Sequence, residues 1–339
     1  MKILLIQLKR IGDLILTTPA IAALRKEFPK ANLYLVVSPA VEGLLPAISG
    51  IDKVFVLRGK PDDALDWIGL VRRRFDYCLD FTRNDRSSFL TLLSKAKKRI
   101  TSDHPNLRTK IRAHSYNEFV NSPVRLLHTI DYHLGLLRPL GIQNASRAIR
   151  LELPKSIMEK ADDLLQTVGA GDEFVVFHPG SARSEKFWEA DRWAEAINHC
   201  LQHPHLRCLL TGGRSAVERA QITAIKSLCE GNVIDLSGRT DLLTLAAVVR
   251  KARLLVTVDS APMHFAAAWD VPQVVLFGPT NPFHWHPRSK SALILAGDSK
   301  VPLTDFDPRQ PALAMNQIST GAVIDAMESL LSATATPTL

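Results

Sequence analysis

Residues 259–264, Asp-Ser-Ala-Pro-Met-His, combine polar side chains with a change from strand to helix that suits phosphate binding. They follow the apolar run 254–258, which is typical of a buried strand, and they precede an Ala-rich helical pattern. Ser260 is a favourable N-cap, and Pro262 suits the first helical turn. The corner therefore presents free backbone N–H groups and the positive end of a helix dipole to an anion. An ordinary capped helix in an α/β domain fits the same residues.

Lys186 is the lysine best placed to meet a phosphate, because it follows a predicted strand and the loop 178–185. The alternative is a solvated lysine ahead of a helix. Residues 211–215, Thr-Gly-Gly-Arg-Ser, lack the P-loop lysine, and the chain has no GxGxxG or HExxH motif. We expect a phosphorylated ligand to be held by Lys, Arg and helix N-termini rather than by a metal.

The elements that would position these residues alternate between strand and helix. In the first half we expect strands near 2–6, 33–37, 51–57 and 77–81, a basic stretch 95–112 that is mostly loop, and a long helix over 122–140. After a polar linker at 141–154 we expect strands near 174–177, 208–210, 233–236, 254–258 and 274–277. This alternation predicts an α/β protein with two doubly wound, Rossmann-like domains, 1–150 and 151–339, facing each other across a cleft. A C-terminal helix is expected near 321–331. It could pack on the second domain or return to pack on the first.

Ligands of such sheets bind beyond the carboxyl ends of the strands. In the second half five loops are expected at this edge, and several are rich in Gly, Ser and Thr: 178–186, 211–218, 237–240, 259–264 and 278–281.

Charge is distributed unevenly along the 339 residues, whose net charge is +8. Residues 1–150 carry 25 Lys and Arg against 13 Asp and Glu, whereas the remainder carries 17 against 21. The first half is therefore expected to meet an anionic partner: nucleic acid, an acidic membrane surface or a phosphorylated substrate. A solvated basic face is the alternative. Nucleic acid is the least favoured partner, because the basic stretch has no interleaved aromatic residues and no helix-turn-helix pattern.

The four cysteines form no CxxC pair and have no metal-ligand spacing, which is typical of buried thiols in a reducing compartment. No apolar run is long enough to cross a bilayer. Lys9, Arg10 and Asp13 interrupt the apolar N-terminal run, so a first strand is expected there rather than a signal peptide. These features predict a cytoplasmic protein.

Four motifs occur together in a fixed order. They are Gly12-Asp13 followed by Leu-Thr-Thr-Pro, then His178-Pro179-Gly180 with Lys186-Phe187-Trp188, then 259–264, then Phe277-Gly278-Pro279-Thr280. From residue 1 to about 287 the chain resembles the ADP-heptose:lipopolysaccharide heptosyltransferases of glycosyltransferase family 9, and the heptosyltransferase III branch most of all.

This resemblance implies the GT-B fold and an inverting, metal-independent and cofactor-free transfer of heptose from ADP-heptose to the lipopolysaccharide inner core. It implies that Asp13 is the general base, although the residues alone favour a charge that complements a helix dipole. Lys186, with the N–H groups at 260 and 261, would stabilise the ADP leaving group.

By the same resemblance the donor would contact Ser181, Glu218, Thr240, Asp259, Ser260, Ala261 and His264. The inner-core acceptor would contact basic residues of the first domain, namely Arg10, Arg83, Arg86, Lys98, Arg99, Arg108, Lys110 and Arg112. The same basic charge could hold the enzyme at the anionic inner membrane surface. The family commonly has Gly where this chain has Ala261, and a hydroxyl residue where it has Ala182, which leaves the identity of the donor more open than the reaction. The alternative functions are a nucleotide-sugar epimerase or hydrolase of the same fold and a non-catalytic sugar-nucleotide-binding protein.

Overall fold

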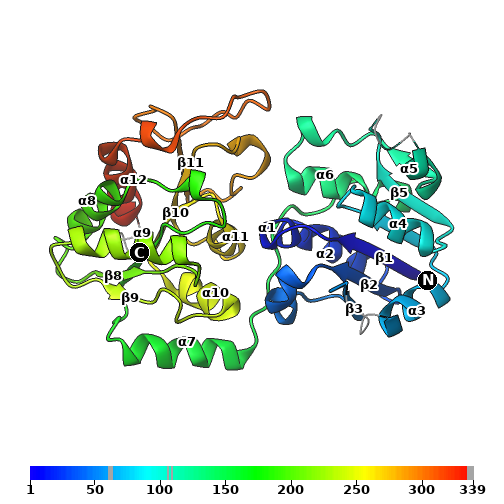
Figure 1. Cartoon of the computed structure of the whole chain (residues 1–339), viewed down its shortest axis with the longest axis horizontal. Coiled ribbons are helices and arrows are strands. Elements are labelled where there is room, and N and C mark those ends of the chain that lie inside the picture. The colour runs from blue at the N-terminus through cyan, green and yellow to red at the C-terminus, as the bar shows by residue number, and fades with distance from the viewer. Residues whose placement is uncertain (60–63, 105–106, 108–109, 334–339) are drawn as a thin grey trace. The chain divides into compact units, whose positions relative to one another are not determined.

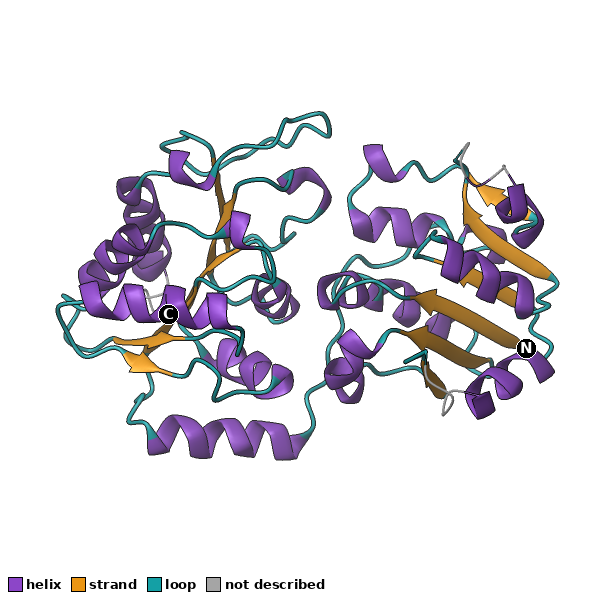
Figure 2. Cartoon of the chain, viewed as in Figure 1, coloured by secondary structure: helices purple, strands orange, loops and turns teal. Residues whose placement is uncertain are grey.

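The computed structural model describes residues 1–59, 64–104, 107 and 110–333. The chain divides into two compact units, Met1–Glu152 and Leu153–Leu339 (Figure 1). The division falls within residues 142–154, which form neither helix nor strand. Strands and helices alternate along both units (Figure 2), as expected for parallel sheets connected by crossover helices.

The first unit contains a six-stranded parallel sheet with the order β3-β2-β1-β4-β5-β6. Its strands are β1 (Lys2–Gln7), β2 (Asn32–Val37), β3 (Lys53–Val56), β4 (Tyr77–Asp80), β5 (Lys98–Ser102) and β6 (Glu118–Val120). Its helices are α1 (Ile11–Ile15), α2 (Thr18–Glu27), α3 (Ala64–Arg72), α4 (Asp85–Leu93), α5 (Lys110–Ser115) and α6 (Thr129–Gly135), with 3-10 turns η1 (Pro39–Ala47), η4 (Val124–Leu126) and η5 (Arg138–Leu140).

The second unit repeats this plan with the order β12-β11-β10-β7-β8-β9, again parallel. Its strands are β7 (Phe174–His178), β8 (Arg207–Leu210), β9 (Ile234–Asp235), β10 (Leu254–Val258), β11 (Gln273–Phe277) and β12 (Ala292–Ala296). Its helices are α7 (Lys155–Thr167), α8 (Ala190–Cys200), α9 (Ala216–Leu228), α10 (Leu242–Lys251), α11 (Ala261–Ala268) and α12 (Thr320–Ala333), with 3-10 turns η6 (Ser184–Lys186), η7 (Pro282–His284) and η8 (Met315–Gln317).

Both faces of the second sheet are buried, which explains why its strands are apolar without alternation. Val256 and Val258 of β10 belong to a core formed with α8, α9 and α12. Successive strand residues point to opposite faces, so Val275 and Phe277 of β11 pack with Met263 of α11 on the other side. Helices on both faces confirm the predicted α/β, doubly wound class.

The C-terminal helix α12 lies in the second unit, beside α8 (Figure 1). Its residues Val323 and Met327 are fully buried in the core with strands β10 and β11. The sequence left both domains possible as the packing partner of this helix. In the structure, α12 buries its apolar face on the second domain. In the described part of the chain, none of the helices has the length and apolar character that crossing a membrane requires.

The basic stretch and the segment after it differ from expectation. Residues 98–102 form the strand β5 rather than a loop, and the short strand β6 was not expected. The predicted helix over 122–140 is wrong, because Pro123 precedes a short 3-10 turn and α6 spans only seven residues. Pro139 then lies in a second 3-10 turn.

Candidate active site

In the second unit the chain changes direction across the sheet between two neighbouring strands, β7 and β10. After β7 the chain adds β8 and β9 on one side, and β10 then pairs with the other side of β7. The loops that follow β7 and β10 therefore leave the sheet in opposite directions at this switch point, where a crevice for ligands is expected. Lys186 lies at the end of the first loop. The second loop is formed by Asp259 and Ser260, and α11 begins directly after it at Ala261.

A buried ion pair joins these two loops. Lys186 Nζ lies 2.5 Å from Asp259 Oδ2, and it also donates to the Asp259 backbone carbonyl at 3.1 Å. The two side chains are only 11% and 10% exposed. The pair places a fixed cation at the carboxyl edge, next to the first residues of α11. If an anionic ligand bound Lys186, the lysine would exchange the Asp259 carboxylate for the ligand as its negative partner. This exchange limits the free-energy cost of desolvating the ligand.

The first turn of α11 offers backbone donors that nothing else uses. Ser260 is the N-cap, but its hydroxyl makes no capping bond to the helix and lies 3.3 Å from Thr257 Oγ1. The predicted cap position is thus confirmed, whereas the expected side-chain capping bond is absent. In the described structure the N–H groups of Ser260 and Ala261 have no partner, and the Met263 N–H donates to the Ser260 carbonyl. Two free N–H groups at the positive end of a helix form an anion site.

Two buried histidines lie at this edge as neutral side chains. Burial lowers the pKa of His264 to about 4, with Asp259 opposing and Lys186 supporting the shift. Its Nδ1 atom is buried and has no hydrogen-bond partner in the described structure. Burial also lowers the pKa of His178 to about 4, and His178 Nδ1 lies 2.9 Å from Thr211 Oγ1. Neither ring adds positive charge at neutral pH, so Lys186 is the cation at this point.

The Glu218 side chain contacts two glycine-containing loops at the carboxyl edge of the second sheet, the loops that follow β7 and β8. It lies in the first turn of α9, accepts the Gly213 N–H at 3.2 Å and accepts the Ser215 hydroxyl at 2.8 Å. A Cβ atom at Gly213 would lie 2.4 Å from Glu218 Oε2, and one at Gly180 would lie 2.5 Å from Oε1. Both glycines are therefore needed so that this carboxylate can rest over the two loops.

Ser181 and Thr240 follow β7 and β9 at the same edge. Ser181 Oγ accepts the Arg183 N–H at 3.3 Å. The structure thus gathers all the predicted donor residues at the carboxyl edge of one sheet.

Asp13 lies at the matching switch point of the first unit, between β1 and β4. Its Oδ2 atom accepts the Arg10 N–H at 3.3 Å, and Lys9 Nζ lies 3.7 Å from Oδ1. Burial raises the pKa of the Asp13 carboxyl above its ordinary value, and Lys9 and the Arg10 amide oppose that rise. Oδ1 is buried and accepts no hydrogen bond in the described structure. One oxygen therefore caps the helix, while the other faces only the Lys9 ammonium group.

A buried network fixes the backbone of Asp13. The Thr17 hydroxyl donates to the Asp13 carbonyl at 2.7 Å and accepts from Gln7 Nε2 at 3.0 Å. His133 Nδ1 lies 3.0 Å from the Leu16 carbonyl, and burial lowers the pKa of this histidine to about 3. These groups position Asp13 and do not themselves reach solvent.

Four of the predicted basic residues lie at the carboxyl side of the first sheet. Arg10 is the exposed N-cap of α1. Arg83 follows β4 with a φ of 63°, held by Asp80 Oδ1 at 3.0 Å, and its guanidinium lies 5.1 Å from the Tyr132 ring centroid. Such backbone strain outside glycine is concentrated at functional sites. Arg86 donates to the Leu57 carbonyl at 2.8 Å.

Arg112 lies on α5 and pairs with Asp85, the first residue of α4, at 2.6 Å. Two further residues predicted to contact the acceptor precede Arg112. Arg108 lies outside the described residues, and only the backbone of Lys110 is described.

Lys98 and Arg99 lie at the opposite, amino edge. The register aligns Lys98 with Tyr77 and, through it, with Ile3, near the start of β1. Lys98 Nζ is 3.7 Å from Glu118, and Arg99 donates to the Ser115 and Ala96 carbonyls. The prediction that these two residues contact the acceptor conflicts with this geometry. A run of like charges in sequence does not reveal on which edge of a sheet each member lies.

Sequence reasoning gave no separate role in the site to three residues of these edges: Lys9, His178 and Gly213. The spacing of Lys9 four residues before Asp13 is a detectable signal, because residues i and i+4 of a helical stretch are neighbours. His178 contacts Thr211, 33 positions away, which no local pattern reveals. Gly213 contacts Glu218 only five residues further on, within the expected ligand loop 211–218.

Known proteins resemble this chain over nearly its whole length. The model of glycosyltransferase family 9 (heptosyltransferase) matches residues 67–310. The lipopolysaccharide heptosyltransferase 3 of Escherichia coli is 25% identical over 337 residues, covering 96% of this chain and 98% of that protein.

Two solved structures show the fold. A glycosyl transferase family 9 protein from Veillonella parvula superposes with a TM-score of 0.81 at 23% identity, covering 98% of this chain and 97% of that one. The E. coli heptosyltransferase WaaC with ADP-2-deoxy-2-fluoro heptose superposes with a TM-score of 0.71 at 20% identity, covering 97% and 99%. The predicted GT-B fold class is confirmed by these likenesses.

Proposed function

Because the chain belongs to glycosyltransferase family 9, as its motifs predicted, we propose that it is an inverting, metal-independent enzyme that transfers heptose from ADP-heptose to the lipopolysaccharide inner core. One relative named above is a lipopolysaccharide heptosyltransferase, and the structure of the heptosyltransferase WaaC contains ADP-2-deoxy-2-fluoro heptose. Near full-length similarity to heptosyltransferase 3 favours the heptosyltransferase III branch.

The observation that carries the proposal is the Lys186–Asp259 pair beside the free N-terminus of α11. In the proposed step an acceptor hydroxyl attacks the anomeric carbon, the bond from that carbon to the diphosphate oxygen breaks, and ADP leaves. The diphosphate gains negative charge during this step. Lys186 and the N–H groups of Ser260 and Ala261 would stabilise that charge without a metal ion.

The first unit would supply the base and bind the acceptor. Asp13 would take the proton of the attacking hydroxyl, an assistance worth about 10²–10⁴-fold in rate. Its buried, unbonded Oδ1 and its raised pKa suit this role. The attack takes place on the face of the sugar opposite to the leaving ADP, and a single displacement of this kind inverts the anomeric centre.

Acceptor and membrane contacts would come from the basic residues at the carboxyl side of the first sheet, Arg10, Arg83, Arg86 and Arg112. Guanidinium groups suit the carboxylates and phosphates of an inner core because they bind such groups in a forked geometry. The excess positive charge of residues 1–150 would favour peripheral association with the anionic cytoplasmic face of the inner membrane, each nearby cation contributing about 1 kcal/mol.

A transfer assay with ADP-heptose and a panel of truncated lipopolysaccharides, with and without EDTA, tests the proposal. We expect one truncated acceptor to gain one heptose per ADP released, with no loss of rate on chelation. ADP release without acceptor modification would indicate a hydrolase, and isomerised donor would indicate an epimerase. Donor binding without any turnover would indicate a binding protein.

A further inference from the structure

Three side chains with metal-binding atoms converge where α8 meets α12. His199 lies in the last turn of α8, His203 lies in the turn that follows, and Glu328 lies on α12. Both imidazole Nε2 atoms approach the same carboxylate oxygen, Glu328 Oε1, at 2.9 and 2.8 Å. The ligand atoms of the three residues all lie within 4.8 Å of one another.

The two nitrogen–oxygen distances are close to what one metal ion needs. A tetrahedral ion with ligands at about 2.0–2.1 Å holds neighbouring ligand atoms about 3.4 Å apart. The two Nε2–Oε1 distances would therefore open by about half an ångström, which side-chain rotation can supply. The ring centroids of His199 and His203 are 6.1 Å apart, so both imidazoles already lie on the same side of Glu328.

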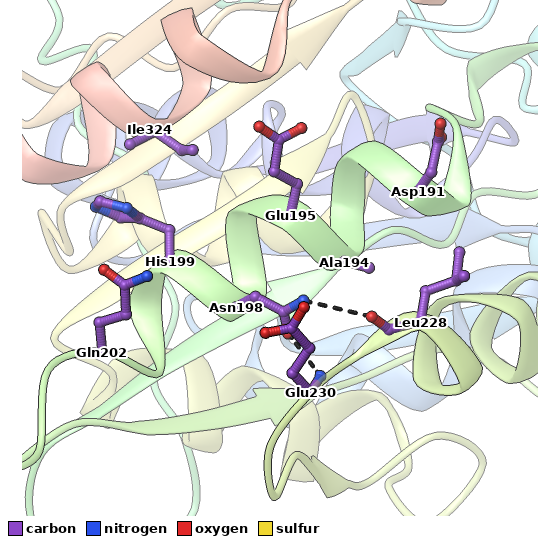
Figure 3. A pocket seen from close by; sticks show the side chains of 9 residues that line it. All are labelled: Asp191, Ala194, Glu195, Asn198, His199, Gln202, Leu228, Glu230 and Ile324. Atoms are coloured by element: carbon purple, nitrogen blue, oxygen red, sulfur yellow. Dashed lines mark hydrogen bonds between the residues drawn. The ribbon is translucent and has the colours of Figure 1, made fainter.

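The cluster is open to solvent and lies beside acidic groups. The three side chains are between 32% and 36% exposed, so water could complete the coordination shell. His199 also lines a surface hollow with Asp191, Glu195 and Glu230, and Figure 3 shows Glu195 and His199 projecting from the same helix toward α12. Nearby carboxylates raise the local concentration of cations.

We propose that His199, His203 and Glu328 bind one divalent transition-metal ion, of which Zn²⁺ is the most suitable, and that this ion fastens α12 to the end of α8. Two imidazoles and one carboxylate favour Zn²⁺, Co²⁺ or Ni²⁺ over Mg²⁺ and Ca²⁺, which prefer oxygen ligands throughout. Without an ion, the same carboxylate joins the helices only through two hydrogen bonds.

The site is structural rather than catalytic. Helix α8 begins at the carboxyl edge, four residues after Lys186, and ends before β8 begins. Its last turn therefore lies at the amino edge of the sheet, away from Lys186 and α11. The inference is independent of the proposed transfer reaction.

Zinc binding to the full chain, purified without a histidine tag, tests the inference. We expect one Zn²⁺ per chain by equilibrium dialysis, and a rise in melting temperature of about 5–10 °C at 100 times the dissociation constant. Co²⁺ should bind competitively with Zn²⁺ and give a visible absorption band of nitrogen and oxygen ligation.

Variants separate this site from chance binding to surface histidines. His199→Ala and Glu328→Gln should each weaken Zn²⁺ binding by at least about 100-fold, because losing only an outer hydrogen-bond partner of a ligand costs 10–100-fold. Glu328→Gln keeps an acceptor for the imidazole N–H groups, so the fold should survive. His114→Ala, which removes an exposed histidine of the first unit, should bind Zn²⁺ like the unmodified chain.

Equal Zn²⁺ binding by Glu328→Gln and the unmodified chain would overturn the inference, as would a melting temperature of the unmodified chain that Zn²⁺ does not raise. The same variant shows at which site EDTA acts if it lowers the transferase rate. A loss of transferase rate with EDTA that disappears in Glu328→Gln would arise at this site, whereas a loss that persists would count against metal-independent transfer.

Discussion

Replacing Lys186 tests whether the Lys186–Asp259 pair serves stability, catalysis or both. Both side chains are almost fully buried, and their charged atoms are 2.5 Å apart. Lys186→Ala leaves the Asp259 carboxylate buried without its cation, which typically costs about 3–5 kcal/mol. At about 2–4 °C per kcal/mol for a domain of this size, the melting temperature should fall by about 6–20 °C.

The double variant Lys186→Ala/Asp259→Asn separates the two roles. A neutral amide has no uncompensated charge, so the residual cost should be only that of an imperfectly bonded polar group, about 1–3 kcal/mol. The double variant should therefore be more stable than Lys186→Ala alone. Its turnover should nevertheless stay about 10²–10³-fold below that of Asp259→Asn, because the cation that stabilises the leaving diphosphate is missing.

Thermal unfolding and initial rates of ADP release with a lipopolysaccharide acceptor, measured on all four proteins, provide the comparison. Equal rates for Asp259→Asn and the double variant would refute the catalytic role of Lys186 and leave it only as a structural partner. An unchanged melting temperature in Lys186→Ala would refute the argument from burial.

Asp13→Asn should lower kcat by about 10²–10⁴-fold while the calorimetric affinity for ADP stays unchanged, and normal turnover would remove Asp13 from the mechanism. Because Asp13 must be deprotonated, activity should fall as the pH drops through its pKa. Lys9 lowers that pKa, so Lys9→Met should move the acidic limb of the kcat/KM profile to higher pH, and an unmoved limb would contradict the pairing. Gly213→Ala should displace the Glu218 carboxylate and weaken ADP binding about 10-fold, as Glu218→Gln should. Titration calorimetry measures both variants, and unaltered affinity in either would exclude Glu218 from the donor site.

The sequence by itself determined the fold class of the protein and the positions along the chain of its candidate site residues. Buried parallel strands need continuous apolar runs, and these runs are visible without a structure. Because ligand-binding loops follow such strands, Lys186 and residues 259–264 could be placed at the ends of β7 and β10. The ordered motifs then identified the family.

Strand order and register, which no local sequence pattern encodes, decided which of these residues lie together in space. They bring Lys186 to Asp259 across 73 positions of chain, and they leave Lys98 and Arg99 at the edge opposite Asp13. Hydrogen-bond partners are likewise chosen in three dimensions, which is why the Ser260 hydroxyl lies by Thr257 and leaves the helix donors free. His199, His203 and Glu328 converge for the same reason: α12 covers α8 only because both bury their apolar faces on one side of the sheet.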